Sequence, residues 1–420
     1  MTAVTSIAGQ PQAAPEDVGM SSTRLANLTR LVQGYIDDGK LAGAVSLVAR
    51  HDKVVHFETY GMQDAEASRP MQPDTLFRIA SMTKPIASVA LMSLYEDGRF
   101  QLDTPIAEFI PAFKDVKVFA GGTAASYDVR TPARRITLRD CLTHTAGFEA
   151  LGADEPTPVT ELYIRAGMGP IQAQGTLADR AAALASLPLA YDPGTRFTYH
   201  YATDIVGRIC EVVSGRPFDA LLQERILEPL GMTDTSFRVP SAQRDRFAAS
   251  YDFTLAAEAP RFRLSDVGWW DVAYEESATF CSAGGGLVST AGDYLRFCRM
   301  LARGGELDGE RILGTRTLRY MTANHLPGGV DLAAMGQPVF SGAPMSGVGF
   351  GLGFAVLLDP TRSGTLGSPG EYFWGGAFST AFFVSPADDL IAIFLTQLLP
   401  NSMYPNRREL RTTVYQAITD

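Results

Sequence analysis

Apolar positions near the start of the chain recur first at helical and then at strand spacing. Four apolar residues fall on one face of a helix that a serine pair can cap and that Gly39 can end. Residues 43–50 and 54–61 are rich in β-branched and aromatic residues and flank a His-Asp-Lys turn, which predicts an antiparallel hairpin. The helical positions are Leu25, Leu28, Val32 and Tyr35, after Ser21-Ser22.

Strand-like runs return in the last third of the chain, separated by short turns that contain Asp and Pro. Strands joined by such turns pair antiparallel, because a parallel pairing needs a crossover of about a dozen residues or more. The predicted strands are 350–358, 378–385 and 390–397, and the predicted helices on either side are 291–301 and 409–418.

The middle of the chain has helix signals instead of strand-like runs. Capping residues and an early proline predict three helices, whereas three other stretches carry much Gly, Pro and Asp with little periodicity. Long loops of this kind in compact domains tend to border functional sites. The predicted helices are 137–142, 204–213 and 217–227, and the predicted loops are 115–135, 149–175 and 240–280.

This order of elements predicts an α+β fold. An antiparallel sheet is assembled from both ends of the chain and flanked by helices, with a mostly helical region inserted between. The 420 residues exceed the roughly 250–300 at which a single core stops growing, so we expect two domains. We expect a disordered leader over residues 1–15, a discontinuous sheet domain over 16–90 and 281–420, and a mostly helical domain with long loops over 91–280.

Composition narrows the possible partners and the compartment. The chain is 46% hydrophobic and 20% charged with a net charge of −10, which argues against nucleic acid and anionic membrane as partners. The first twenty residues lack the basic and apolar regions of a signal peptide, so we expect a cytoplasmic protein. Four widely spaced cysteines predict reduced, mostly buried thiols and no zinc site.

Ser81 and Lys84 are the first candidates for chemistry. Three residues apart at the start of a helix, a hydroxyl and an amine lie on one face. The apolar run 86–95 follows directly, and a desolvated amine is a candidate neutral base. The chain has five lysines among 36 basic residues, so a lysine in an apolar context is uncommon here. A Ser-x-x-K tetrad alone is a weak signal, and a helix-capping Ser81 with an extended Lys84 is the structural alternative.

Two later segments carry further candidates. Tyr199 follows a turn at Asp192-Pro193-Gly194, and a tyrosine beside an ammonium can shuttle a proton to a leaving group; packing under a loop is its alternative role. Trp374-Gly375-Gly376 precedes the predicted strand from Phe378, where glycines permit close approach to the backbone. A free backbone N–H at such a place can face an acyl oxygen.

Five motifs taken together resemble the serine β-lactamase and penicillin-binding-protein superfamily, most closely its class C β-lactamase-like esterases, the family VIII carboxylesterases. The resemblance runs in the same order from about residue 16 to the C-terminus. The motifs are Ser81-Met82-Thr83-Lys84, Leu142-Thr143-His144-Thr145-Ala146-Gly147, Pro193-Gly194-x-x-Phe197-x-Tyr199, Glu228-Pro229-Leu230-Gly231-Met232 and Gly285-Gly286-Leu287-Val288-Ser289-Thr290.

The resemblance implies a β-lactamase/transpeptidase-like fold and an acylation–deacylation cycle without metal or organic cofactor. Ser81 would be the nucleophile, with Lys84 and Tyr199 as the coupled base. The backbone N–H groups of Ser81 and Ala377 would hold the oxyanion.

Two departures from the β-lactamase pattern change the expected substrate. Trp374-Gly375-Gly376 stands where penicillin-recognising relatives carry Lys-Thr-Gly or His-x-Gly, so the cation for a β-lactam carboxylate is missing. In the Tyr-x-Asn motif, Tyr201 replaces the amide. Both changes favour neutral, apolar esters. His200, Tyr201 and the tryptophan-glycine motif are the candidate pocket residues, with Trp269 and Trp270 as a possible wall; structural packing is the alternative for His200 and for the two tryptophans.

We therefore expect a serine carboxylesterase for short-chain esters, weak at most on β-lactams. The partner would be a small-molecule ester, without nucleic acid or membrane, and monomer and dimer both stay open. A β-lactamase, a D-amino-acid peptidase or amidase, and an acyltransferase use the same Ser/Lys/Tyr site and are the enzymatic alternatives. A sensor that acylates once needs no deacylation machinery, and a Ser-His-Asp hydrolase would carry a GxSxG motif, which the sequence lacks.

Overall fold

An eight-stranded sheet forms the core of the computed structural model, which describes residues 10–149, 157–169, 173–255, 258–265, 271–336 and 345–420. The strand order is β12-β13-β14-β15-β16-β1-β2-β3, and every neighbouring pair is antiparallel. The strands are β1 Gly43–Arg50, β2 Lys53–Asp64, β3 Arg69–Pro70, β12 Val348–Phe350, β13 Ala355–Leu357, β14 Tyr372–Gly375, β15 Ala381–Ser385 and β16 Leu390–Thr396.

The pairing of β1 with β16 joins the two ends of the chain in the middle of the sheet. The register runs from Ala44 opposite Thr396 to Arg50 opposite Leu390. Both strands are buried along their whole length, because helices cover both faces of the sheet at this point. The predicted antiparallel sheet assembled from both chain ends is confirmed.

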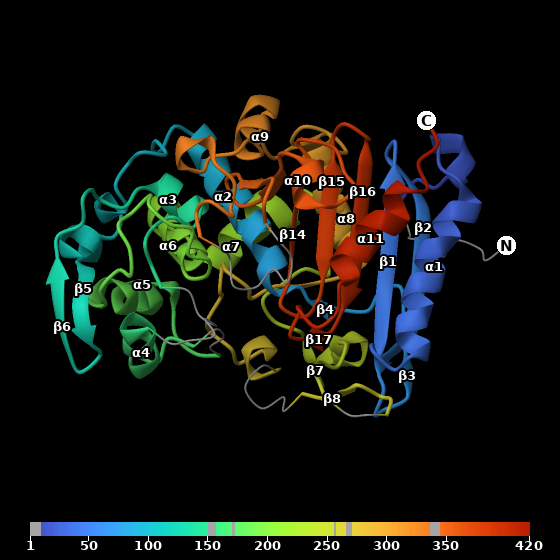
Figure 1. Cartoon of the computed structure of the whole chain (residues 1–420), viewed down its shortest axis with the longest axis horizontal. Coiled ribbons are helices and arrows are strands. Elements are labelled where there is room, and N and C mark those ends of the chain that lie inside the picture. Colours follow the sequence, from blue (N-terminus) through green and yellow to red (C-terminus); the bar gives the residue numbers. More distant parts are fainter. Residues whose placement is uncertain (1–9, 150–156, 170–172, 256–257, 266–270, 337–344) are drawn as a thin grey trace.

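Helices α1 (Ser22–Asp37) and α11 (Asn406–Tyr415) pack on one face of the sheet (Figure 1). Ser21 caps α1 by accepting a hydrogen bond from the Arg24 N–H, and the four predicted apolar positions are the buried ones. On the other face lie α8 (Ala291–Ala302) and α2 (Thr83–Glu96), which is buried from Thr83 to Leu94.

The helices from the middle of the chain gather at one end of the molecule, beside α2 (Figure 1). They are α3 Leu138–Leu142, α4 Pro158–Arg165, α5 Leu177–Ser186, α6 Ala202–Ser214 and α7 Phe218–Leu222, the last continued by a π-helical turn at Gln223–Leu227; α9 Thr315–Met321 and α10 Pro360–Ser363 follow later in the chain. The predicted helices at 137–142, 204–213 and 217–227 are confirmed. The domain division stays a prediction; its boundary at residue 90 falls inside α2.

Three expectations about irregular segments are wrong. The predicted loop 115–135 holds the hairpin β5 (Val118–Thr123) and β6 (Ser126–Arg130); β6 alternates polar and apolar residues over five positions, all of them exposed, and this short pattern was missed. The loop 149–175 contains α4, and the loop 240–280 contains β7 (Tyr251–Phe253) and β8 (Phe262–Leu264), with β17 (Leu398–Leu399) paired parallel to β7. The other short strands are β4 Phe77–Arg78, β9 Val288–Ser289, β10 Glu306–Leu307 and β11 Glu310–Arg311.

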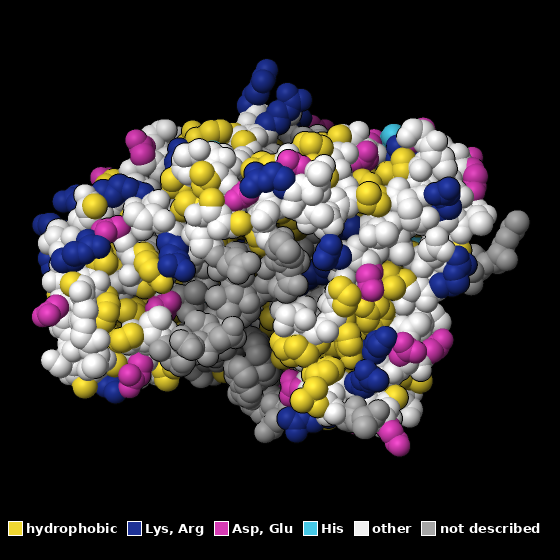
Figure 2. Space-filling model, in the orientation of Figure 1, with side chains coloured by type: hydrophobic (Ala, Val, Ile, Leu, Met, Phe, Trp, Pro, Cys, Tyr) yellow, Lys and Arg dark blue, Asp and Glu magenta, His cyan; other side chains and the backbone are white. Residues whose placement is uncertain are grey.

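A disordered leader was expected over residues 1–15. Residues 1–9 lie outside the described residues, and disorder is the wrong expectation for residues 10–15, because Val54 on β2 exchanges backbone hydrogen bonds with Pro11 and Ala13. On the face in Figure 2, basic and acidic side chains are interspersed.

A buried ion pair fastens α11 to the sheet. Glu371, fully buried beside β14, accepts hydrogen bonds from Arg411 and from the Tyr415 hydroxyl. The Arg411 guanidinium also lies 4.3 Å from the centre of the Phe373 ring and 5.0 Å from that of Phe383. Burial lowers the pKa of Arg411 to about 10, so the guanidinium stays charged at neutral pH.

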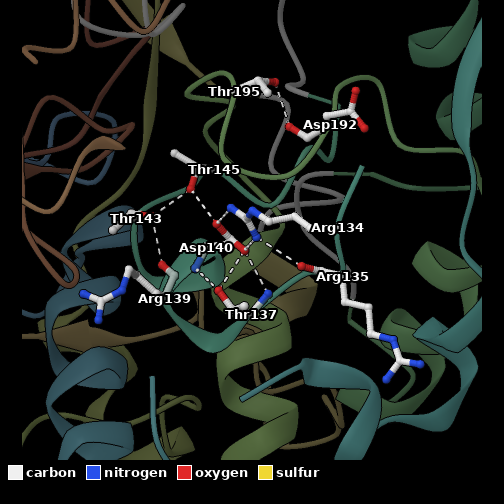
Figure 3. A network of polar contacts seen from close by, with 9 residues as sticks. All are labelled: Arg134, Arg135, Thr137, Arg139, Asp140, Thr143, Thr145, Asp192 and Thr195. Atoms are coloured by element: carbon white, nitrogen blue, oxygen red, sulfur yellow. Dashed lines mark hydrogen bonds and ion pairs between the residues drawn. The ribbon is translucent and has the colours of Figure 1, made fainter. Parts of the chain in front are cut away.

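A second carboxylate, Asp140 on α3, organises the loop that follows this helix (Figure 3). It is 3% exposed and accepts two hydrogen bonds from the Arg134 guanidinium, at 2.6 and 2.7 Å. The Thr137 N–H and hydroxyl and the Thr145 hydroxyl donate to the same carboxylate. All of these contacts lie within a stretch of twelve residues, so the loop is held locally.

Backbone hydrogen bonds connect the loop after Asp140 to the segment that contains Tyr199. The Gly194 N–H donates to the Thr145 carbonyl at 2.7 Å, and the Thr198 N–H donates to the His144 carbonyl at 2.8 Å. The segment 192–199 is therefore hydrogen-bonded along the loop 143–147.

Replacing Glu371 by leucine should lower the free energy of unfolding by about 3–5 kcal/mol, because it leaves the buried Arg411 without its anion. The double variant Glu371→Leu/Arg411→Met should recover most of that loss. Urea unfolding measures both. Glu161→Gln, at the exposed pair with Arg165, is the control and should cost less than about 0.5 kcal/mol. A single variant no worse than this control would contradict the argument.

Replacing Asp140 by asparagine should lower the free energy of unfolding by about 2 kcal/mol, because charge-assisted hydrogen bonds to a buried carboxylate are lost. The matched control is Asp179→Asn, which removes an exposed carboxylate from the same kind of helix cap on α5. Urea unfolding should show a distinctly smaller loss for this control. Equal losses in the two variants would mean that the Arg134 pair adds no stability.

Candidate active site

Ser81 is presented by a strained turn between a short strand and a long buried helix. The strand β4 ends at Arg78, a 3₁₀ turn covers Ala80–Met82, and α2 begins at Thr83. Ala80, directly before Ser81, has a φ of 43°, in the left-handed region that non-glycine residues rarely adopt. Such strain costs about 1–3 kcal/mol and clusters at functional sites, so the backbone itself marks Ser81.

The structure brings Lys84 into contact with Ser81. The Lys84 Nζ atom lies 3.2 Å from the Ser81 Oγ atom and donates to the Gly284 carbonyl at 2.6 Å. Lys84 is 4% exposed, whereas Ser81 is partly open to solvent. The amine is thus held on the hydroxyl by a backbone carbonyl, and the hydroxyl can be reached from outside.

Asp204 fixes the loop that supplies this carbonyl. Its Oδ1 atom accepts hydrogen bonds from the Ser282 hydroxyl at 2.8 Å and from the Gly284 N–H at 3.0 Å. Asp204 is buried in the first turn of α6, and the Arg180 Nε atom lies 3.9 Å from its other oxygen. Sequence reasoning missed Asp204 as a site residue. The signal that could have found it is an acidic residue five positions after Tyr199, in the first turn of a helix.

Tyr199 lies beside the Ser81–Lys84 pair. The Lys84 Nζ atom is 4.5 Å from the centre of its ring, and the Trp374 indole N–H donates to its hydroxyl oxygen at 2.9 Å. The ring is 5% exposed and packs with those of His144 and Phe197, in the same buried cluster as Phe350. Trp374 therefore supplies a neutral hydrogen-bond donor to Tyr199.

Two histidines border this group and are neutral at physiological pH. Burial, then the positive charges of Lys84 and Arg180, lower the pKa of His200 to about 3. Burial, then Lys84 and His200, hold the pKa of His144 well below its ordinary value. The Nδ1 atom of each ring has no hydrogen-bond partner in the described part of the chain. Tyr201, another predicted pocket residue, is 1% exposed and donates its hydroxyl to the Met168 carbonyl in the helical core.

The tryptophan-glycine motif lies at the end of a strand, not at the start of one as expected. Trp374 and Gly375 end β14, and a turn over residues 376–380 leads into β15. The expectation failed because β14 is short and only Tyr372 is fully buried in it. Any Cβ at Gly376 would overlap the Ile79 carbonyl oxygen and the Thr380 side chain. The turn that carries Ala377 is therefore packed against the backbone two residues before Ser81.

Arg407 is a second residue that sequence reasoning missed. It comes from the start of α11, and its Nη2 atom donates to the carbonyls of Gly376 and Thr380, at 2.7 and 3.1 Å. A Cβ at Gly375 would lie 2.6 Å from the guanidinium carbon. No local pattern marks Arg407, because three arginines occur in this helix and only the tertiary fold selects one of them.

The predicted pocket wall Trp269 and Trp270 lies outside the described residues. Over the part of the chain that is described, no three His, Cys, Asp or Glu side chains gather as a metal ion would require. Within the same residues, none of the helices combines the length and apolar character of a membrane span. Cys141, Cys210 and Cys298 are buried free thiols, and Cys281 is a partly buried one.

The chain is similar to known proteins over most of its length. An uncharacterized protein of Mycobacterium tuberculosis is 39% identical over 375 residues, covering 88% of this chain and 89% of its own. Esterase EstB of Burkholderia gladioli is 30% identical over 407 residues, covering 93% and 95%. The solved structure of EstCE1, a hydrolase with promiscuous acyltransferase activity, superposes with a TM-score of 0.76 at 27% identity and covers 94% of this chain and 99% of its own.

The family described as Beta-lactamase matches residues 28–416. This span contains both halves of the sheet, the α2 helix with Ser81 and Lys84 at its start, and the segments of Tyr199 and Trp374. The chain belongs to the beta-lactamase family.

Proposed function

We propose that this chain is a serine carboxylesterase that cleaves short-chain esters through an acyl-enzyme intermediate. The observation that carries the proposal is the Ser81–Lys84 contact of 3.2 Å, placed directly after the strained Ala80 and beside Tyr199. A nucleophile within hydrogen-bond reach of its base, itself oriented by a third group, is the signature of covalent catalysis. The similarity to Esterase EstB supports the same reaction class.

In the proposed acylation, Ser81 Oγ attacks the ester carbonyl carbon while its proton passes to the Lys84–Tyr199 pair. The carbonyl oxygen becomes an oxyanion that accepts hydrogen bonds from the backbone N–H groups of Ser81 and Ala377. When the oxyanion collapses, the C–O bond to the alcohol breaks and the alcohol takes up the proton. Water then attacks the acyl-enzyme by the reverse sequence and releases the acid.

The polar groups around Tyr199 favour a neutral substrate. Trp374 presents an N–H without charge, and this N–H is engaged with the Tyr199 hydroxyl. The cation Arg407, whose charge interacts with Tyr199, is engaged with two backbone carbonyls. A carboxylate on the substrate would therefore have to displace existing hydrogen bonds, which is why we propose weak activity at most on β-lactams.

Acyl transfer is the second candidate. An alcohol that replaces water in the second step uses the same residues, and EstCE1 is described as a hydrolase with promiscuous acyltransferase activity. The buried aromatic cluster around Tyr199 makes this side of the site apolar, which would favour an alcohol over water at the acyl-enzyme. Product analysis with added short-chain alcohols separates ester exchange from hydrolysis.

A small-molecule ester as partner and a cytoplasmic location complete the proposal. Four free thiols are typical of a reducing compartment, since disulfides persist in oxidising ones. Monomer and dimer both remain open.

Replacing Ser81 by alanine should lower kcat on p-nitrophenyl butyrate by about a thousandfold or more. Lys84→Ala and Tyr199→Phe should each lower it by about a hundredfold or more, since each removes part of the proton path. Intact-mass measurement should show an acyl adduct on the wild type and none on Ser81→Ala. Near-wild-type turnover in folded Ser81→Ala or Lys84→Ala would overturn the mechanism.

Replacing Trp374 by phenylalanine should lower kcat about tenfold, because it removes the donor to the Tyr199 hydroxyl while keeping an aromatic ring. The control is the same change in a Tyr199→Phe background, where it should have little further effect because the accepting oxygen is gone. Equal losses in both backgrounds would show that Trp374 acts through packing alone.

A further inference from the structure

The turn between β14 and β15 is clamped by the first two residues of α11. Asn406 donates from its side chain to the Ser379 carbonyl at 3.3 Å. Arg407 donates to the Gly376 and Thr380 carbonyls, one at each end of the turn. In the orientation that satisfies both groups, the Asn401 amide oxygen lies 2.9 Å from each terminal nitrogen of the guanidinium. The guanidinium is therefore fixed behind the turn.

One of these contacts reaches the proposed oxyanion donor through a single peptide unit. The carbonyl oxygen of Gly376 and the N–H of Ala377 belong to the same planar, conjugated amide. A cation that hydrogen-bonds the oxygen of such an amide draws electron density from its nitrogen and makes the N–H a stronger donor. The distance from Arg407 Nη2 to the Gly376 oxygen, 2.7 Å, is that of a charge-assisted hydrogen bond.

We propose that Arg407 is a positioning residue that polarises the Gly376–Ala377 peptide and thereby strengthens the Ala377 N–H as an oxyanion donor. This inference rests on the proposed function, because it needs an oxyanion between Ser81 and Ala377. The positive charge helps most when negative charge develops on the substrate oxygen, so it stabilises the transition state more than bound ester.

Two features of the surroundings support this role. Glycine at position 375 leaves room for the guanidinium, because a Cβ there would lie 2.6 Å from its central carbon. Burial lowers the pKa of Arg407 to about 10, with the nearby Tyr199 acting in the opposite direction, so the side chain is charged throughout the neutral range. The clamp and the charge are thus both present at working pH.

The test compares Arg407→Met and Arg407→Lys with the neighbouring Arg408→Met as matched control. Arg408 is exposed and donates to the Gly364 carbonyl, away from the turn. The readouts are kcat and KM on p-nitrophenyl butyrate, the inhibition constant of phenylboronic acid, and the midpoint of urea unfolding. The boronate is chosen because its tetrahedral adduct on serine carries an oxyanion-like hydroxyl.

We expect Arg407→Met to lower kcat about thirtyfold or more with KM within about threefold, and to weaken phenylboronic acid by a similar factor. Arg407→Lys should recover part of both losses, and Arg408→Met should match the wild type. An unchanged kcat in folded Arg407→Met, a loss confined to KM, or a loss of kcat without weaker boronate inhibition would overturn the inference. Ser81→Ala is run in parallel: turnover that survives it refutes the proposed function itself, whatever Arg407 does.

Discussion

The close approach of the Gly376 backbone to the carbonyl of Ile79 is the contact on which the rest of the site depends. It joins two segments almost three hundred residues apart, and any side chain at position 376 would push them apart. The sheet makes the approach possible, because the β1–β16 pairing sets one end of the chain beside the other. The segment of the strained Ala80 turn therefore packs against the Gly376 backbone. This packing holds a costly backbone conformation in the folded state.

The cations near Ser81 are bound by backbone carbonyls and not by carboxylates. Lys84 donates to Gly284, and Arg407 donates to Gly376 and Thr380. A carboxylate partner would cancel the charge locally, whereas a carbonyl dipole positions the cation and leaves most of its field intact. Both neighbouring histidines are neutral, so they add no positive charge to that of these two side chains. Such an arrangement suits a reaction in which negative charge develops on the substrate.

Elements with strong periodicity were predictable from the sequence, and contacts set by the tertiary fold were not. The α1 face, the first hairpin and the strands β15 and β16 follow from apolar spacing and turn length alone. The single strand expected over 350–358 is wrong, because this segment belongs to the short antiparallel strands β12 and β13 and the turn between them. The exposed β6 strand carries its alternation over only five residues, and β14 is shorter still, with four. Within the site, Ser81 and Lys84 meet because three residues along a helix start lie on one face, whereas Asp204 and Arg407 reach it from other helices. Long-range polar contacts leave no local trace in a sequence.

Trp374 gives the Tyr199 hydroxyl a hydrogen bond without a charge. An ammonium beside the hydroxyl would stabilise a phenolate by direct charge, but the indole N–H offers one neutral hydrogen bond in a fixed direction. The oxygen that accepts this bond also carries the hydroxyl proton, which is a separate donor. Lys84, over the ring face, then supplies the nearby charge. Trp374 thus orients the Tyr199 hydroxyl while Lys84 supplies the charge, so the two effects come from different residues and can be changed independently.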